Sequence, residues 1–354
     1  MLRLALNLGT WTSAPADEQL ALCREAQRLG YDVIWVAEAY GSDAATPLAW
    51  IAAHTERIGI GSGVWQIPAR TPAMTAMTAA TLDSLSGGRF RLGLGVSGPQ
   101  VSEGWHGVRF ARPVSRLREY AEAVRLALSR QPLTYAGQSI AVPPPGSDVR
   151  SMALAMRPVR ERIPLYLAAV GPRALDLTGD VADGWLSSFA DPGSVAEAVA
   201  RLQGRRRARA ADVPGDLDVT VSCPLVVTGE HDDPLAAADA VRPHAALYVG
   251  GMGGREDNVY AKIAARLGHG EAAATVQDLY LSRRREEAAA AVPAAFIDQV
   301  SLLGPPSRIA VRMRELAAAG ATTLSLTPFG GTAAQRLDML AGAAQALRLA
   351  NEAP

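Results

Sequence analysis

Residues able to transfer protons stand at the end of one run that reads as a β-strand and in the segment that follows another. Carboxylates, phenols and imidazoles are among the side chains that act as general acids and bases. The candidate catalytic residues are Glu38, Tyr40, Asp43 and His106. Two alternatives stay open, because Glu38 could instead pair with an arginine and His106 could instead cap a loop.

Glycine recurs in another run, "GIGSGVWQIPARTP", which extends from Gly59 to Pro72. The run begins like a strand, yet its glycines leave nothing to pack, and glycine costs order in a strand interior. Something must therefore approach this backbone closely. Either the glycines relieve packing inside a tight fold, or they make room for a ligand.

Histidine and lysine are scarce, which argues against two common kinds of active site. None of the five histidines forms a His-x-His pair, whereas a metal site needs clustered ligands. Lys262 is the only lysine and lies in a predicted helix, whereas a Schiff-base enzyme needs a lysine at a strand end. No metal site is predicted. We expect a site that holds a flat, apolar cofactor ring, which brings its own chemistry.

Short apolar strands alternate with amphipathic helices along the chain. The predicted strands cover residues 3–9, 31–38, 57–64, 89–98, 163–171, 184–189, 218–228 and 322–329. Eight such strand–helix units predict an α/β fold of the closed (β/α)8 TIM-barrel type, with an open doubly wound sheet as the alternative. In a barrel the active site lies at the carboxyl ends of the strands, where the candidate residues stand.

Two stretches interrupt the alternation. Residues 131–162 read as an irregular insertion, and residues 229–304 read as an alanine-rich, charged, helical insertion. Because both fit within one barrel, we expect a single domain over residues 1–354.

Composition narrows the choice of partner and compartment. The formal net charge is zero and the pI is about 7.0, so neither nucleic acid nor a membrane surface is an expected partner. The first residues are too short an apolar run for a signal peptide, and no run approaches the ~20 residues that span a bilayer. Cys23 and Cys223 show no metal or redox spacing. We interpret both as buried or incidental thiols in a reducing cytoplasm, and therefore expect a cytoplasmic protein.

Three segments together resemble the luciferase-like flavin and deazaflavin oxidoreductases, in the branch that uses coenzyme F420. They read "RIGIGSGVWQIPARTPAMTAMTAATLDSLSGGRFRLGLGVSGPQVSEGWHGVRF", "IPLYLAAVGPRALDLTGDVADGWL" and "FIDQVSLLGPPSRIAVRMRELAAAGATTLSLTP". The likeness covers nearly the whole chain, except for the helical insertion from about Gly229 to Ala295. The pair "SGGRFRLGLGVSGP" and "AAVGPRALDLTGDVADGW" is specific, whereas either motif alone is less so.

The resemblance implies positions that hold the coenzyme. Its members often carry a cis peptide after the third strand, here Gly63–Val64, with Val64 behind the ring. The residues implied to bind the cofactor are Gly61, Gly63, Val64, Ser97, Gly98, Ala168, Ala169, Gly171 and Trp185. The alternatives left open are packing glycines at Gly61 and Gly63, a helix N-cap at Ser97 and a plain turn at Gly171. Arg70 is implied to meet the acidic tail of the coenzyme, or else to be a rim charge.

A substrate pocket is expected beside the ring. Its candidate lining residues are Trp11, Trp65, Glu103 and Trp105, and some of these tryptophans are expected to be plain core residues. Many relatives place a histidine where Ala39 stands here, which removes their usual proton donor.

The resemblance thus implies an F420-dependent oxidoreductase. Hydride would pass between C5 of the deazaflavin and a small organic substrate, either reducing a C=C or C=N bond or oxidising an alcohol. The alternatives are an FMN-dependent monooxygenase of the same superfamily and a non-catalytic flavin-binding barrel. Relatives are often dimers, so a homodimer is one option.

Overall fold

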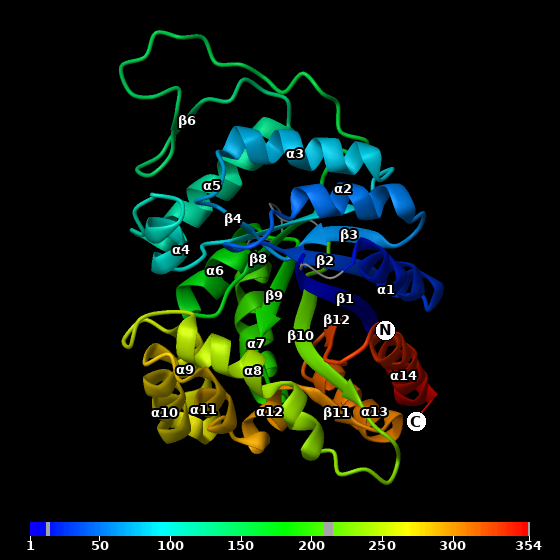
Figure 1. Ribbon diagram of the computed structural model, residues 1–354. Helices are drawn as coiled ribbons and strands as arrows, with labels where there is room; N and C mark the ends of the chain where they lie inside the picture. The colour runs from blue at the N-terminus through cyan, green and yellow to red at the C-terminus, as the bar shows by residue number, and fades with distance from the viewer. Residues whose placement is uncertain (12–14, 209–214, 353–354) are drawn as a thin grey trace. The chain divides into compact units, whose positions relative to one another are not determined.

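A computed structural model of the chain describes residues 1–11, 15–208 and 215–352 (Figure 1). Within these residues eight parallel strands close into one ring. In ring order they are β10 (Asp218–Val227), β12 (Thr323–Pro328), β1 (Arg3–Thr10), β2 (Val33–Ala37), β3 (Gly59–Ser62), β5 (Phe90–Gly95), β8 (Leu165–Ala168) and β9 (Gly184–Ser188), which pairs again with β10. The eight are the predicted strands, so the (β/α)8 barrel is confirmed.

Helices follow the strands as expected. Those of the predicted barrel rhythm are α1 (Ala16–Arg28), α2 (Ala45–His54), α3 (Pro72–Leu85), α5 (Pro113–Leu128), α6 (Pro172–Val181), α7 (Pro192–Ala208), α13 (Pro306–Ala318) and α14 (Ala333–Glu352). The residues at the two ends of α3 explain where this helix begins and ends. Thr71 accepts a hydrogen bond from the backbone N–H of Met74, and Gly87 and Gly88 end the helix with positive φ angles.

The two stretches that interrupt the alternation differ in structure. Residues 131–162 carry only the short hairpin of β6 (Tyr135–Ala136) and β7 (Ala141–Val142). The helical insertion contains η1 (Ala236–Ala240), α8 (Arg242–Ala246), η2 (Leu247–Gly251), α9 (Val259–Ala264), η3 (Ala265–His269), α10 (Gly270–Leu281), α11 (Arg285–Ala290) and α12 (Ala294–Val300). It ends in an unpredicted strand, β11 (Leu302–Gly304), which pairs with β10. Three residues are too few to show a strand period.

The chain divides into two compact units. The first, which we call the site unit, comprises Ala5–Leu186 and Ala200–Val219. The second, the insertion unit, comprises Met1–Leu4, Ser187–Val199 and Thr220–Pro354. All the candidate site residues lie in the site unit. A single domain over residues 1–354 stays a prediction.

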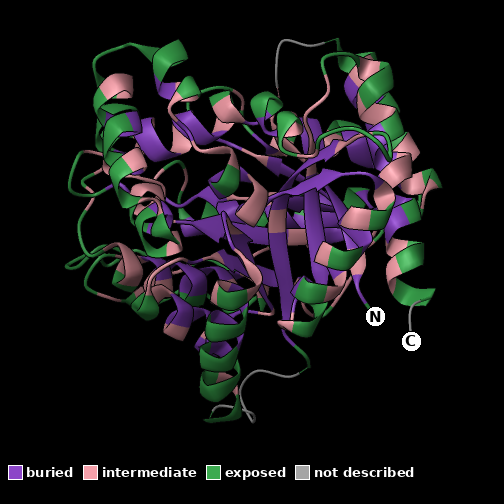
Figure 2. Ribbon diagram, turned by 90° about the horizontal axis from the view of Figure 1, so that it is seen from below, coloured by how far each residue is buried: buried purple, intermediate pink, exposed green. Residues whose placement is uncertain are grey.

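The core of the site unit is built around Trp35. Its indole meets the Tyr166 ring edge-on, with 5.1 Å between ring centroids, and Ala5, Val33 and Leu186 complete the cluster. Figure 2 shows the strands largely buried, while the helices expose one face. Both cysteines are buried, as predicted.

Candidate functional site

Strand β3 breaks where the sequence placed its glycines. The ladder pairs Gly61 with Arg91, then resumes when β4 (Trp65–Gln66) pairs with Leu94 and Gly95. In the gap the Gly63–Val64 peptide is cis, which confirms the position that the resemblance implied. The geometry of the break is therefore held by contacts other than the strand ladder.

The Ser62 hydroxyl replaces part of the interrupted ladder. It donates to the carbonyl of Gly93 at 2.9 Å and accepts from the N–H of Gly93 at 2.8 Å. A Cβ atom at Gly93 would lie 2.0 Å from the Ser62 carbonyl oxygen, so only glycine allows this approach. Both backbone groups of Gly93 thus find a partner inside the buried barrel.

The indole of Trp35 is what comes so close to the glycine-rich strand. A Cβ atom at Gly61 would lie 2.3 Å from Cζ3 of Trp35, and one at Gly63 would lie 3.0 Å from its Cβ. Gly61 is therefore a packing glycine, because the Trp35 indole occupies the space that a side chain at position 61 would need. Coenzyme contacts of Gly61 and Gly63 stay predictions.

Val64 packs among small residues. It is half-buried and packs with Ala168 against the Trp35 cluster. A Cβ atom at Gly95 would lie 2.6 Å from Cγ2 of Val64, so the absence of a side chain at Gly95 leaves the space that Val64 occupies. Gly95 was not among the predicted residues. Its signal is the alternation of Gly93 and Gly95 in "RLGLG", which matches the alternation in β3.

Two loops at strand ends carry the other predicted cofactor positions. Ser97 adopts the left-handed conformation, with φ 63°, and the N-cap of α4 (Pro99–Gly104) is Gly98, so the helix-cap alternative for Ser97 is wrong. Gly171 is the N-cap of α6, with Pro172 directly after it, and no atom lies within 4 Å of the position of its missing Cβ. Pro172 has no N–H, and the N–H groups of Ala174 and Leu175 donate to the carbonyl of Gly171, so the N–H of Arg173 is the donor that this turn leaves for an anion.

The end of β8 is fixed by a tryptophan. Nε1 of Trp185 donates to the carbonyl of Ala169 at 2.8 Å, and Trp185 is buried. Ala168, at the end of the strand, is the small residue that lies beside Val64. The role of all three residues toward a cofactor stays a prediction.

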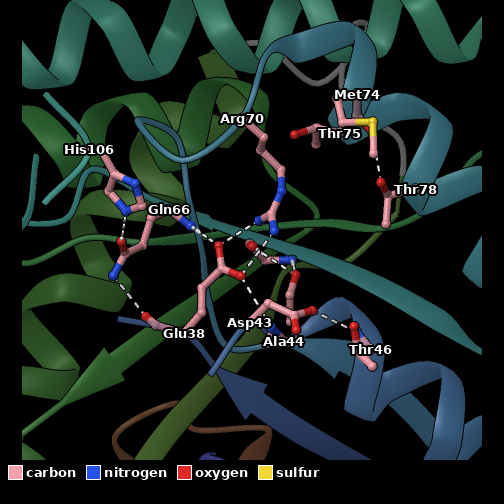
Figure 3. Close-up of polar contacts among 12 residues, drawn as sticks. Glu38, Asp43, Ala44, Thr46, Gln66, Arg70, Met74, Thr75, Thr78 and His106 are labelled. Carbon is pink, nitrogen blue, oxygen red and sulfur yellow. Dashed lines mark hydrogen bonds and ion pairs between the residues drawn. The ribbon is translucent and has the colours of Figure 1, made fainter. Parts of the chain in front are cut away.

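Glu38 stands at the centre of a buried polar network (Figure 3). Its carboxylate accepts from the N–H of Ala44 at 3.2 Å and from the N–H of Gln66 at 3.0 Å, and it forms a bidentate ion pair with Arg70. Charge-assisted bidentate pairs are strong and directional. The ion-pair alternative is therefore what this structure contains, whereas proton transfer by Glu38 stays a prediction.

Arg70 links this network to the core. Its guanidinium lies 4.7 Å from the ring centroid of Trp65, and its carbonyl accepts from the Tyr120 hydroxyl at 2.9 Å. Trp65 has no exposed surface and packs against Phe90. Trp65 is thus one of the tryptophans in a core position.

Gln66 joins the Glu38 network to His106. Its side-chain N–H donates to the carbonyl of Glu38 at 2.8 Å, and its Oε1 lies 3.1 Å from Nε2 of His106. Gln66 was not among the predicted site residues. Its only sequence signal is its place as a polar residue at the end of the glycine-rich strand.

The remaining predicted residues lie apart from the network. Tyr40 and Trp105 are exposed by 57% and 64%. Oδ1 of Asp43 accepts from the N–H of Thr46 in the first turn of α2. Their catalytic and substrate-binding roles stay predictions.

Two further positions complete the rim. Oε1 of Glu103 accepts from the N–H of Phe110 at 2.8 Å, which closes the loop after α4. Trp11 is half-buried after β1.

In the part of the chain that the structure describes, no group of three His, Cys, Asp or Glu residues could hold a metal ion. None of the described helices is long and apolar enough to cross a membrane.

Known proteins resemble this chain along most of its length. A family model described as luciferase-like monooxygenase matches residues 4–323. A protein of Mycobacterium tuberculosis, assigned by its name to the coenzyme F420-dependent oxidoreductases, is 39% identical over 352 residues, which cover 96% of this chain and 98% of that protein.

Two solved structures share the fold. The coenzyme F420-dependent tetrahydromethanopterin reductase of Methanopyrus kandleri matches with a TM-score of 0.81 and 22% identity, over 97% of each chain. An F420-dependent secondary alcohol dehydrogenase, solved with an F420–acetone adduct, matches with a TM-score of 0.77 and 16% identity, over 98% of this chain and 99% of that one.

Proposed function

This chain belongs to the luciferase-like monooxygenase family, and we propose that it is a coenzyme F420-dependent oxidoreductase acting on a small organic substrate. The observation that carries the proposal is the 39% identity, over almost the whole of both chains, to a protein named for that coenzyme. A likeness of this extent includes the strand ends, where the barrel family places its active sites.

The residues present fit a flat ring at the end of β3. Gly95 and Ala168 bring no bulk to the space around Val64, whose side chain packs against the Trp35 cluster. The first turn of α6, with Gly171 as its cap, would hold the phosphate of the coenzyme. Bound there, the deazaflavin would supply two-electron hydride exchange at C5.

The protein's residues would then bind the coenzyme, align the substrate with it and transfer a proton. Since Ala39 cannot act as a proton donor, we assign the proton to His106, which the Gln66 contact holds near the end of β4. Glu38 and Arg70 hold the backbone around them. The substrate is a small molecule that gains or loses one hydride and one proton, at a C=C or C=N bond or at an alcohol.

The test is a titration of the purified protein with F420 and, separately, with FMN, followed by cofactor fluorescence. Tight binding of F420 and weak binding of FMN supports the proposal and directs a screen of alcohols and activated double bonds. Preference for FMN, with oxygen uptake in the presence of reduced FMN, would move the assignment to a monooxygenase. Binding of neither cofactor would overturn it.

A further inference from the structure

We propose that Gln66 is a positioning residue for His106. It fixes the imidazole ring and keeps the proton of the neutral ring on Nε2, so that Nδ1 is the nitrogen that exchanges a proton with the substrate. The last step rests on the proposed function, whereas the orientation of the ring does not.

Gln66 is held firmly enough to position another side chain. Its backbone N–H donates to the Glu38 carboxylate at 3.0 Å and its side-chain amide donates to the Glu38 carbonyl at 2.8 Å. Gln66 is 6% exposed, and Arg70 in turn fixes the Glu38 carboxylate. Rotation of the amide would break a buried hydrogen bond, which costs about 1–3 kcal/mol when the freed group stays unsatisfied.

The contacts decide which end of the amide faces His106. The Glu38 carbonyl can only accept a hydrogen bond, so the amide NH2 of Gln66 must point toward it. The reversed amide would set two carbonyl oxygens against each other. Oε1 of Gln66 therefore faces His106 and can only accept (Figure 3).

The imidazole must then donate from Nε2. A neutral imidazole has one donor and one acceptor nitrogen, and the hydrogen bond made by one of them selects the tautomer. Because Oε1 of Gln66 accepts at 3.1 Å, Nε2 carries the proton and Nδ1 keeps its lone pair. His106 is half-buried, and its backbone N–H donates to the carbonyl of Val101. The backbone that carries the ring is therefore fixed.

The proton balance follows directly. Reduction of a C=C or C=N bond would need one proton beside the hydride that bound F420 would supply, and the His106 imidazolium would donate that proton from Nδ1 to the substrate atom that does not take the hydride. Oxidation of an alcohol would need a base for the hydroxyl proton, and Nδ1 of the neutral His106 ring would accept it. In both directions the Nε2–H stays bonded to Gln66. The nearby charges are already engaged, since Glu38 pairs with Arg70 and Glu103 accepts from Phe110.

Nitrogen-15 NMR of the histidine rings in the cofactor-free protein tests the orientation. The H106N variant assigns the His106 signals among those of the five histidines. We expect the neutral His106 ring to be protonated at Nε2, with an N–H that exchanges slowly with water. A ring protonated at Nδ1, or a rapidly exchanging mixture, would overturn the proposal.

Substitutions at Gln66 test its role. Q66M keeps a long unbranched side chain but removes both amide contacts, and we expect it to speed exchange of the Nε2–H at least tenfold. The matched control is Q27M, which removes three backbone contacts, from the N–H groups of Glu56, Arg57 and Ile58, far from His106 in the sequence. It should leave the His106 signals unchanged.

Turnover separates this inference from the proposed function. Once a substrate is known, Q66M should lower kcat by about tenfold or more while the F420 affinity changes little, because general acid–base groups contribute 10²–10⁴-fold. A Q66M enzyme that binds F420 and turns over within twofold of wild type overturns the positioning role. Failure of the wild-type protein to bind F420 overturns the function, whereas the NMR result still decides the orientation of His106.

Discussion

The Ser62 hydroxyl contacts both backbone polar groups of Gly93, donating to the carbonyl at 2.9 Å and accepting from the N–H at 2.8 Å. It takes the place of a ladder bond where β3 gives way to β4. Because Ser62 is fully buried, water cannot substitute for either contact.

S62A should therefore destabilise the site unit. The substitution leaves two buried backbone groups without their partner, and each unsatisfied group costs about 1–3 kcal/mol. Urea denaturation should show a lower free energy of unfolding. The control is S129A, which removes one exposed contact to Leu126. Equal effects of the two variants would contradict the role given to Ser62.

G95A should displace the side chain of Val64. The added Cβ atom would lie 2.6 Å from Cγ2 of Val64, a β-branched side chain with little freedom to move away. Overpacking of this kind costs about 1–3 kcal/mol, and we expect F420 affinity to fall by about tenfold. The fluorescence titration measures this affinity.

The control for G95A is G104A. No atom lies within 4 Å of a Cβ atom built at Gly104, which is exposed at the end of α4. That variant should bind the coenzyme as the wild type does. If G95A and G104A bind F420 equally well, Val64 does not support the ring.

The sequence predicted the barrel better than it predicted the site. Each of the eight strands is a short apolar run bounded by turn residues, which is local information. The role of Gln66 depends on His106, forty positions away, and the room at Gly61 is filled by Trp35 from the neighbouring strand. Such contacts exist only after the strands pair. For Glu38, the sequence could name an ion pair as an option but could not say which arginine supplies it.

E38Q should cost stability whether or not Glu38 takes part in catalysis. The side chains of Glu38 and Arg70 are only 5% and 14% exposed, and removing one partner of a buried pair costs about 3–5 kcal/mol. The double variant E38Q/R70M should recover part of that loss, because no unpaired charge remains. Thermal or urea unfolding measures both.

A surface pair provides the comparison for E38Q. Arg284 and Glu287 form an exposed i,i+3 pair, and E287Q should leave stability almost unchanged. If E38Q unfolds like the wild type but no longer turns over, the acid–base role of Glu38 would be favoured over the ion-pair role.

His244 should make the protein sensitive to acid. Its ring lies among those of Phe189, Tyr248 and Phe329 in the insertion unit, and burial lowers its pKa to about 4. The unfolded chain has an ordinary histidine pKa of about 6.5, so between these values the unfolded state binds a proton that the folded state does not. The free energy of unfolding should therefore fall as the pH drops from about 6.5 to about 4, by up to about 3 kcal/mol.

Urea denaturation at a series of pH values measures this dependence. H244F replaces the ring by one that cannot be protonated, so its stability should fall less steeply over the same range. The matched control is H231Q, which removes an exposed histidine and should leave the wild-type slope unchanged. Parallel curves for the wild type and H244F would mean that the folded protein accommodates a charged ring at this position. In that case the aromatic cluster opens to water, and acid sensitivity must come from other groups.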